Sequence, residues 1–210
     1  MFKDRVEAGQ KLGARLIDRK GSEVVVIAIP RGGVIVGYQI ALMLSAPLDI
    51  VIPRKIRAPL NPELAIGAVT EDGEVIIDRK LVDRLNVGEK YIEAERKRQS
   101  EEINRRAKIY RSGKSRIPVK GKVVILTDDG VATGSTMKAA IMTIRRMSPK
   151  SIIVAVPVAP SGVEFELGLG FNEFICLLSP EHFYAIGQFY RNFPQVDDEE
   201  VNEILKKASS

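Results

Sequence analysis

The stretch from Val123 to Thr136 constrains the fold more than any other part of this chain of 210 residues. It opens with an apolar run typical of a buried strand, and two adjacent carboxylates, Asp128 and Asp129, follow that run. A short turn rich in hydroxyl side chains then leads into a predicted helix over about 135–147. This order of strand, acids, turn and helix predicts a βα unit whose turn binds a ligand.

The residue types in this stretch suit a phosphorylated sugar. Paired carboxylates at the end of a strand can accept hydrogen bonds from two neighbouring ribose hydroxyls. A phosphate can bind the backbone N–H groups of the turn, the N-terminus of the following helix and the hydroxyls of Thr133, Ser135 and Thr136. The alternative is an ordinary βα turn in which Ser135 or Thr136 only caps the helix. That alternative leaves the two carboxylates without a role.

Alternating strands and helices predict a parallel sheet covered on both faces. The apolar, mostly β-branched runs that mark strands lie at about 24–29, 48–52, 123–126, 152–156 and 174–178. Helices are predicted over about 2–18, 34–44 and 135–147, and a strand pair at 65–70 and 74–78. We therefore expect an α/β fold with a doubly wound, mainly parallel five-stranded core sheet and flanking helices.

Two segments depart from this alternation. Residues 79–116 are highly charged, and their opposite charges at helical spacing predict a solvated helical insert with a narrow apolar stripe, formed by Ile103, Ala107 and Tyr110. Residues 179–210 are predicted to form a small C-terminal hood or tail. Its aromatic side chains can stack on a planar ligand or pack in the core; they are Phe183, Tyr184, Phe189 and Tyr190. The length fits one domain over residues 1–210.

The composition narrows the classes of partner. The net charge of +5 fits a small polyanionic substrate as well as nucleic acid, and no basic run is interleaved with aromatic residues, so nucleic-acid binding is not expected. The single cysteine, Cys176, lies in an apolar run, which predicts a buried strand residue and a reducing cytoplasm. Neither a signal peptide nor a membrane span is predicted, so we expect a cytoplasmic protein without a membrane partner.

Three turns are expected to meet, because ligands of doubly wound sheets bind beyond the carboxyl ends of the strands. The first strand is followed by Arg31-Gly32-Gly33, the second by Arg54-Lys55 and the third by the turn from Asp128 to Thr136. Two cationic turns therefore face one acidic turn that can bind phosphate. This combination suits a ligand with phosphate groups at both ends.

The segment Asp128-Asp129, followed by Ala132-Thr133-Gly134-Ser135-Thr136, resembles the motif with which type I phosphoribosyltransferases bind 5-phosphoribosyl-1-pyrophosphate (PRPP). In that family a hydrophobic strand precedes two acids and a loop ending Thr-Gly-x-Thr. The resemblance covers about 24–178 and the tail segment 183–190, and it is to a less characterised bacterial and archaeal group. It implies transfer of a phosphoribosyl group between PRPP and a nitrogenous base. It also implies that the acids hold the ribose while residues 132–136 hold the 5′-phosphate.

The same resemblance implies pyrophosphate-binding roles for the two basic turns. Residues Arg31, Gly32 and Gly33 match the turn that holds pyrophosphate on backbone N–H groups. Residues Arg54 and Lys55 match basic residues at the base of a mobile catalytic loop, expected here over about 55–65. They would stabilise the departing pyrophosphate while the closed loop excludes water. Solvated basic side chains are the alternative for Lys55 and Arg57.

The resemblance also bears on cofactor, base and partners. Pyrophosphate implies Mg²⁺, held mainly by substrate oxygens and water, with Asp128 and Asp129 touching it directly or through water. Ala132 stands where 6-oxopurine enzymes carry an aspartate that exchanges a proton with the purine, which disfavours hypoxanthine and guanine. The expected partners are PRPP, a nucleobase or nucleoside monophosphate, and a second copy in a homodimer.

A regulator on the same fold is the alternative to an enzyme. Such a protein would sense PRPP or a nucleotide without turnover, and fold alone does not separate the two functions. The pair Arg54-Lys55 favours catalysis, because a sensor need not stabilise a leaving group.

Overall fold

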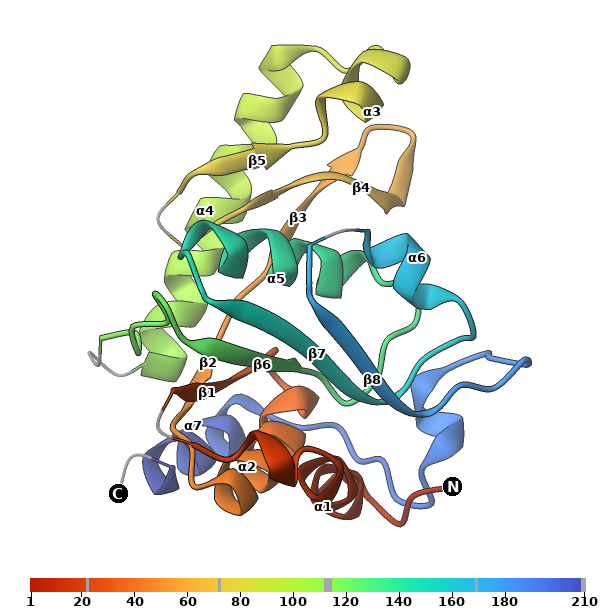
Figure 1. Cartoon of the computed structure of the whole chain (residues 1–210). Helices are drawn as coiled ribbons and strands as arrows, with labels where there is room; N and C mark the ends of the chain where they lie inside the picture. The colour runs from red at the N-terminus through yellow and green to blue at the C-terminus, as the bar shows by residue number, and fades with distance from the viewer. Residues whose placement is uncertain (22, 72, 112–114, 169, 209–210) are drawn as a thin grey trace.

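The computed structural model describes residues 1–21, 23–71, 73–111, 115–168 and 170–208. Its centre is a five-stranded sheet in the order β2-β1-β6-β7-β8 (Figure 1), in which every pair of neighbours is parallel. The strands are β1 (Val24–Ala28), β2 (Leu48–Ile50), β6 (Val123–Thr127), β7 (Ser151–Val158) and β8 (Glu173–Leu178). The predicted doubly wound core sheet is confirmed, and each strand lies within two or three residues of its predicted bounds.

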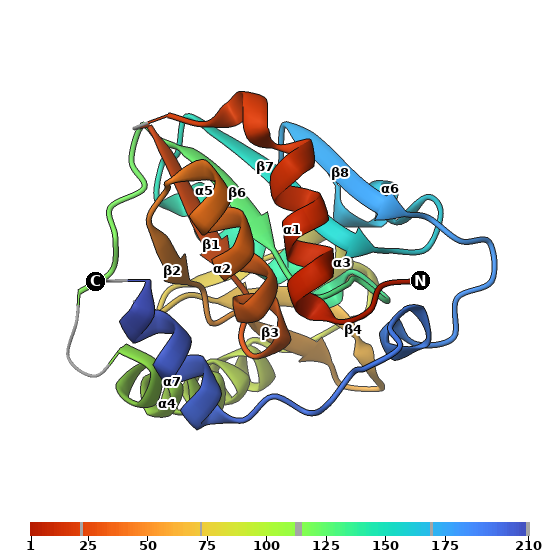
Figure 2. The same ribbon diagram turned by 90° about the horizontal axis from the view of Figure 1, so that it is seen from below.

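Successive residues of β1 face opposite sides of the sheet and so build two cores. Val24, Val26 and Ala28 pack with helices α1 (Arg5–Arg15) and α2 (Gly32–Leu44). Val25 and Ile27 pack with α5 (Ser135–Arg146) and α6 (Val163–Leu167). Figure 2 shows α1 and α2 lying across the lower face of the sheet. Because helices cover both faces, every position of β1 is apolar and buried.

The strand order creates a switch point between β1 and β6. From β1 the chain continues to β2 on one side, whereas from β6 it continues to β7 on the other. The two strands stay paired at their carboxyl ends, where the N–H of Ile29 donates to the carbonyl oxygen of Thr127 at 2.9 Å. The turns that follow β1 and β6 therefore lie side by side, in the position where such sheets bind ligands.

A second, antiparallel sheet follows β2. It contains β3 (Arg54–Ala58), β4 (Asn61–Val69) and β5 (Val75–Ile77) in that order. The predicted strand pair is confirmed, although Asp72 in its predicted turn lies outside the described residues. The segment over 55–65, expected to be a mobile loop, forms the β3–β4 hairpin and not an irregular loop. Alternate side chains explain the hairpin: Ile56 and Ala58 are buried, whereas Arg57 is exposed.

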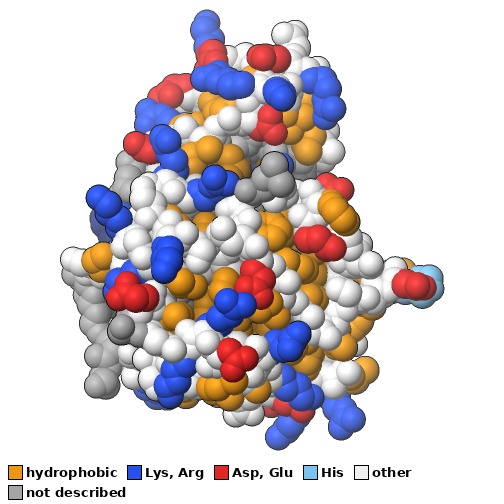
Figure 3. Space-filling model, in the orientation of Figure 1, with side chains coloured by type: hydrophobic (Ala, Val, Ile, Leu, Met, Phe, Trp, Pro, Cys, Tyr) orange, Lys and Arg blue, Asp and Glu red, His pale blue; other side chains and the backbone are white. Residues whose placement is uncertain are grey.

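The charged insert forms two helices rather than one. They are α3 (Arg79–Arg84) and α4 (Glu89–Arg111), separated by a turn in which Asn86 has a φ of 50°. The predicted apolar stripe packs on the rest of the chain, with Ile103 and Tyr110 both buried. Figure 3 shows charged side chains of both signs over the upper part of the molecule, where α3 and α4 lie. Of the helices in the described ranges, α4 included, none is long and apolar enough to cross a membrane.

Buried ion pairs anchor the end of α4 to the core. The guanidinium group of Arg111 lies 2.7 Å from a carboxylate oxygen of Asp49 on β2 and 3.2 Å from one of Glu71. Asp49 also accepts a hydrogen bond from the backbone N–H of Ile117 at 2.7 Å. The three charged side chains are nearly excluded from solvent. This network fixes the C-terminal end of α4 against β2.

The two ends of the described chain pair with each other. The N–H of Phe2 donates to the carbonyl oxygen of Phe189 at 2.8 Å, and the N–H of Arg191 donates to the carbonyl oxygen of Phe2 at 2.9 Å. We call residues 2–5 together with 189–194 the strap. η2 (Ile186–Phe189) leads into the strap and α7 (Asp198–Lys207) follows it, whereas η1 (Ile17–Arg19) lies after the other end of α1.

The predicted tail aromatics divide into two groups. The ring of Tyr190 is buried between Phe2 and Phe193, so for this residue core packing is correct and stacking on a ligand is wrong. Phe183 and Phe189 pack on each other and on the same cluster. The side chain of Tyr184, in contrast, is 88% exposed.

Cys176 lies on a strand, as predicted, but it is half-buried rather than buried. The reason is that β8 is an edge strand with a neighbour on one side only. Partial burial raises the pKa of its thiol, which is the behaviour of an inert side chain.

Candidate active site

The predicted acid pair lies at the switch point of the sheet. We call residues 128–136 the acid turn, because Asp128 and Asp129 open it directly after β6. The backbone N–H of Asp129 donates to Oδ1 of Asp128 at 2.8 Å, which ties the two residues together. Both carboxyl groups are largely withdrawn from solvent, and the side chain of Asp129 is only 13% exposed.

The glycines that follow β1 pack against this acid pair. Gly32 and Gly33 form the first turn of α2 rather than a loop before it. A Cβ atom at Gly33 would lie 2.8 Å from the Cα atom of Asp128, and one at Gly32 would overlap the carboxylate of Asp129. Glycine is therefore required at both positions for close approach. The approach also brings the positive end of the α2 dipole to the two carboxylates.

Burial dominates the electrostatics of the pair. It raises the pKa of Asp128 well above its ordinary value, and the neighbouring charge of Asp129 acts in the same direction. Burial also raises the pKa of Asp129, while the guanidinium group of Arg5 opposes that shift. Ionisable groups perturbed in this way by burial and by a specific partner are concentrated at functional sites.

Two residues that the sequence did not connect with the site hold Asp129. Nε of Arg5, at the start of α1, donates to Oδ2 of Asp129 at 2.7 Å. The hydroxyl of Tyr190 donates to the backbone carbonyl oxygen of Asp129 at 2.6 Å. Both side chains are buried, although they come from opposite ends of the chain. No local pattern links residues so far apart, so only the three-dimensional structure could identify them.

The second half of the acid turn forms an open helix N-terminus. Gly134 precedes α5 with a φ of 74°, a conformation that favours glycine. Ala132, Thr133 and Thr136 are exposed, and the hydroxyl oxygens of Thr133 and Ser135 are 3.2 Å apart. The five residues predicted to bind phosphate thus occupy one turn, with hydroxyls and backbone N–H groups at the start of a helix.

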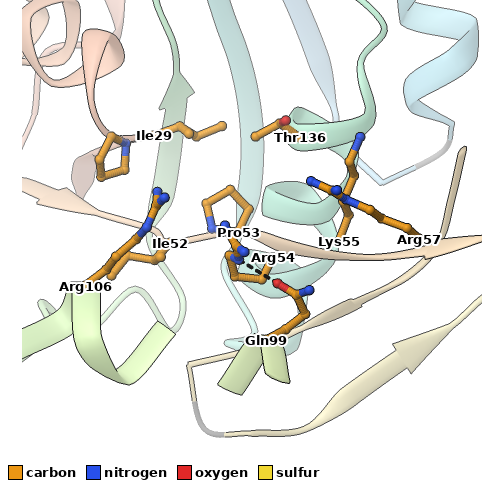
Figure 4. Close-up of a pocket in the computed structure, with 10 residues that line it drawn as sticks. Ile29, Ile52, Pro53, Arg54, Lys55, Arg57, Gln99, Arg106 and Thr136 are labelled. Atoms are coloured by element: carbon orange, nitrogen blue, oxygen red, sulfur yellow. Dashed lines mark hydrogen bonds between the residues drawn. The ribbon is translucent and has the colours of Figure 1, made fainter. Parts of the chain in front are cut away.

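A basic cavity opens beside this turn, with a volume of about 200 Å³. We call it the basic pocket (Figure 4). The residues that line it are Ile29, Pro30, Ile52, Pro53, Arg54, Lys55, Arg57, Gln99, Arg106 and Thr136. They come from the turns after β1, β2 and β6, together with β3 and α4. The three turns that the sequence placed together therefore do meet.

Four cationic side chains surround the basic pocket. Figure 4 shows Arg106 reaching from α4 on one side of Arg54, with Lys55 and Arg57 on the other. Nε of Arg54 donates to the amide oxygen of Gln99 at 2.8 Å, and burial together with the charge of Arg106 lowers the pKa of Arg54. Such crowding of like charges is suited to a polyanion, which several guanidinium groups can bind at once.

Gln99 and Arg106 are pocket residues that sequence reasoning missed. They lie on the charged insert, whose regular alternation of signs indicated only a solvated helix. Arg106 takes part in that pattern, because its Nε donates to a carboxylate oxygen of Glu102 at 2.8 Å. The sequence therefore contains a correct signal for the helix but none for the pocket that it lines.

Arg31 lies apart from the basic pocket. Its guanidinium group is 3.7 Å from a carboxylate oxygen of Asp198 on α7, and both side chains are substantially exposed. The Pro30–Arg31 peptide bond is cis, and Pro30 itself lines the pocket. The backbone of this turn thus borders the site, whereas the Arg31 side chain contacts the tail.

The acid pair is the place where a cation would fit. Among the described residues no group of three or more His, Cys, Asp and Glu side chains could hold a metal ion. One carboxylate oxygen of Asp129 is already engaged by Arg5. Two adjacent carboxylates with this partner suit Mg²⁺ that takes most of its ligands from phosphate and water.

Comparisons with known proteins agree with this geometry. A family model described as the phosphoribosyl transferase domain matches residues 3–167. A protein of Mycobacterium tuberculosis, Rv0571c, whose name assigns it provisionally to the phosphoribosyl transferases, is 39% identical over 208 residues. The match covers 99% of this chain and 47% of that protein. The chain thus spans about half the length of the curated relatives it matches.

Solved structures show the same arrangement of elements. The protein TT1426 from Thermus thermophilus is 39% identical, with a TM-score of 0.90 over 98% of each chain. APRTase from Giardia lamblia in complex with 9-deazaadenine has a TM-score of 0.50, with 15% identity over 84% of this chain and 79% of that one. At that identity the second comparison shows a shared fold.

Proposed function

The chain belongs to the phosphoribosyl transferase family, and from this premise we propose that it transfers a phosphoribosyl group between PRPP and a nitrogenous base, releasing pyrophosphate. One observation carries the proposal: the acid turn and the basic pocket adjoin beyond the carboxyl ends of the core strands, and Thr136 belongs to both. PRPP has a phosphate at one end and a pyrophosphate at the other, which matches a phosphate-binding turn beside a cationic pocket.

The acid turn holds the phosphoribosyl group in this proposal. Asp128 and Asp129 accept hydrogen bonds from the ribose hydroxyls and stabilise the positive charge that develops on the ribose as pyrophosphate leaves. The backbone N–H groups and hydroxyls from Ala132 to Thr136 bind the 5′-phosphate at the start of α5. The close packing of Asp128 and Asp129 against α2 supports the role of the acid pair, because a fixed ribose brings the reacting carbon to one place.

The basic pocket receives the pyrophosphate. Arg54, Lys55, Arg57 and Arg106 supply positive charge where negative charge builds on the leaving group. Pro30, directly before the turn expected to bind pyrophosphate, lines the same space. Mg²⁺ bound by the pyrophosphate oxygens, water and the acid pair would neutralise further charge on the leaving group.

The base is the least defined part of the proposal. Ala132 offers a methyl group where a 6-oxopurine enzyme needs a carboxylate, so hypoxanthine and guanine are poor candidates. Tyr184 is the tail aromatic whose ring is most exposed, and it is our candidate for covering the base. We further propose that the protein acts in the cytoplasm as a homodimer, to be tested by fractionation and by light scattering.

The decisive experiment neutralises the acid pair. The double variant Asp128→Asn/Asp129→Asn should lose PRPP-dependent pyrophosphate release by more than about 1,000-fold, while its far-UV circular dichroism stays that of the wild type. A matched control is Glu199→Gln/Glu200→Gln, which neutralises two adjacent exposed acids on α7. This control should keep wild-type turnover.

A panel of bases separates the enzyme from the regulator. Pyrophosphate release with one base, in the presence of Mg²⁺, supports the enzyme and identifies the acceptor. Tight PRPP binding with no release for any base would instead support a sensor. Unchanged turnover in the acid-pair variant would contradict the assignment of the site.

A further inference from the structure

The carboxylate of Asp129 is held by a side chain from outside the βα unit that carries it. Two of the four carboxylate oxygens in the acid pair are engaged within the chain: Oδ1 of Asp128 by the N–H of Asp129, and Oδ2 of Asp129 by Nε of Arg5. Arg5 is 7% exposed, so it is a buried cation with a defined partner. A buried charge pair of this kind fixes geometry, because moving either group leaves the other unpaired.

Arg5 is itself fixed by the C-terminal half of the strap. One of its terminal nitrogens donates to the backbone carbonyl oxygen of Pro194 at 2.8 Å. Its guanidinium carbon lies 3.7 Å from the centre of the Phe193 ring, which is a cation–π contact. Arg5 thus has an anion, a carbonyl and an aromatic ring around it, and little freedom to move.

The same half of the strap also forms a hydrogen bond with the backbone of Asp129. The hydroxyl of Tyr190 donates to the carbonyl oxygen of Asp129, and the ring of Tyr190 packs against Phe2. Backbone hydrogen bonds between residues 2–3 and 189–192 keep Tyr190 in place beside Arg5. Both the side chain and the main chain of Asp129 are therefore held by residues of the strap.

We infer that Arg5 and Tyr190 are positioning residues, through which the strap sets the second acid of the pair in the orientation that binds the ribose of PRPP. The choice of ligand rests on the proposed function, whereas the restraint on the acid turn does not. Arg5 also offsets one of the two negative charges of the pair, so two neighbouring carboxylates can be buried together.

The test compares three variants with a control. Arg5→Gln removes the charge, Arg5→Lys keeps it, and Tyr190→Phe removes only the hydroxyl. Arg19→Gln is the control, since Arg19 also pairs with a single carboxylate, Glu173, but away from the site. Each protein is studied by hydrogen–deuterium exchange without ligand and by titration with PRPP and Mg²⁺, at a temperature well below its unfolding midpoint.

Arg5→Gln should speed hydrogen–deuterium exchange at least tenfold in peptides covering 127–136 and leave exchange in β7 unchanged. It should also weaken PRPP binding about 30-fold, the size of effect expected when one partner of a buried charge pair is lost. Arg5→Lys should recover most of that affinity, and Tyr190→Phe should lose about threefold. Arg19→Gln should match the wild type. Recovery by lysine separates positioning by charge from general destabilisation.

Two outcomes separate this inference from the proposed function. If Arg5→Gln leaves both exchange in 127–136 and PRPP affinity unchanged, the inference is overturned while the proposed function stands. If the wild type binds no PRPP but Arg5→Gln still speeds exchange at the acid turn, the strap is retained and the proposed function fails.

Discussion

The acid turn and the basic pocket adjoin at Thr136, yet they are built in opposite ways. The acid turn is braced on every side, by the first turn of α2 and by Arg5 and Tyr190. The charges of the basic pocket are carried by long side chains on β3 and α4. Arg54 is held by the buried side chain of Gln99, whereas Arg106 and its partner Glu102 are partly exposed. The contrast matches the demands of the proposed reaction. The ribose must be held in one position, whereas the side chains of the basic pocket must stay in contact with the pyrophosphate while it moves away.

Bracing also has an energetic side. Two carboxylates withdrawn from water are costly in free energy, and a single arginine offsets only part of that cost. The fixed geometry of the acid turn therefore lowers the free energy of unfolding, whereas the charges of the basic pocket lie closer to solvent. Substitutions in the acid turn should accordingly change the stability of the protein, whereas substitutions in the basic pocket should change ligand binding with little effect on stability.

The largest effect is expected from a substitution that forces α2 and the acid turn apart. Gly33→Ala places a Cβ atom 2.8 Å from the backbone of Asp128, so either α2 or the acid turn must shift. We expect a loss of about 2 kcal/mol in the free energy of unfolding, measured in urea, together with loss of PRPP binding. Gly21→Ala, where no atom lies within 4 Å, is the control and should stay within about 0.5 kcal/mol of the wild type. A stable Gly33→Ala protein with normal PRPP affinity would show that the acid turn is not braced by α2.

Two neighbouring arginines on α4 provide a test of the basic pocket. Arg105 and Arg106 both pair with Glu102, but only Arg106 is among the residues lining the basic pocket. Arg106→Ala should weaken binding of magnesium pyrophosphate about tenfold, or roughly 1.4 kcal/mol, with little change in unfolding. Arg105→Ala should stay within about twofold of the wild type in a calorimetric titration. Equal effects of the two substitutions would mean that α4 acts through its general charge and not through the pocket.

The smallest expected effect concerns the loss of stability caused by the buried carboxylate of Asp128. Burial raises the pKa of Asp128 above that of the unfolded chain, so its ionised form destabilises the native protein at neutral pH. Asp128→Asn should therefore raise the melting temperature by a few degrees at pH 8 in a metal chelator. This advantage should shrink as the pH falls through the native pKa and vanish below about pH 4, where the carboxyl is neutral in both states. A lower melting temperature at pH 8 would indicate that the carboxylate stabilises the fold.

The sequence predicted what is encoded locally. The apolar runs predicted all five strands of the core sheet, because strands covered on both faces need no polar positions. The motif from Asp128 to Thr136 likewise predicted one turn with its acids and hydroxyls together. The convergence of Arg54 and Lys55 with that turn followed from the strand order expected for the fold.

What the sequence did not predict depends on distant contacts. Arg5 and Tyr190 have ordinary local surroundings, and their role appears only when both meet Asp129. The loop over 55–65 was expected from the family resemblance, whereas burial of Ile56 and Ala58 makes this segment a hairpin. Arg106 lies on a helix whose charges alternate in sign at helical spacing, and that pattern predicts only a solvated helix. In each case the missing information is tertiary packing, which overrides the local pattern.

The strap has a consequence for biosynthesis. Arg5 precedes every strand of the core sheet in the chain, whereas its carbonyl and aromatic partners and Tyr190 follow the last strand and are made much later. At usual rates of translation the interval is on the order of 10 to 40 s. During that time the core sheet can form while the two acids still lack half of their restraints. The chain therefore acquires its finished site only after all the strands of its core sheet have been made.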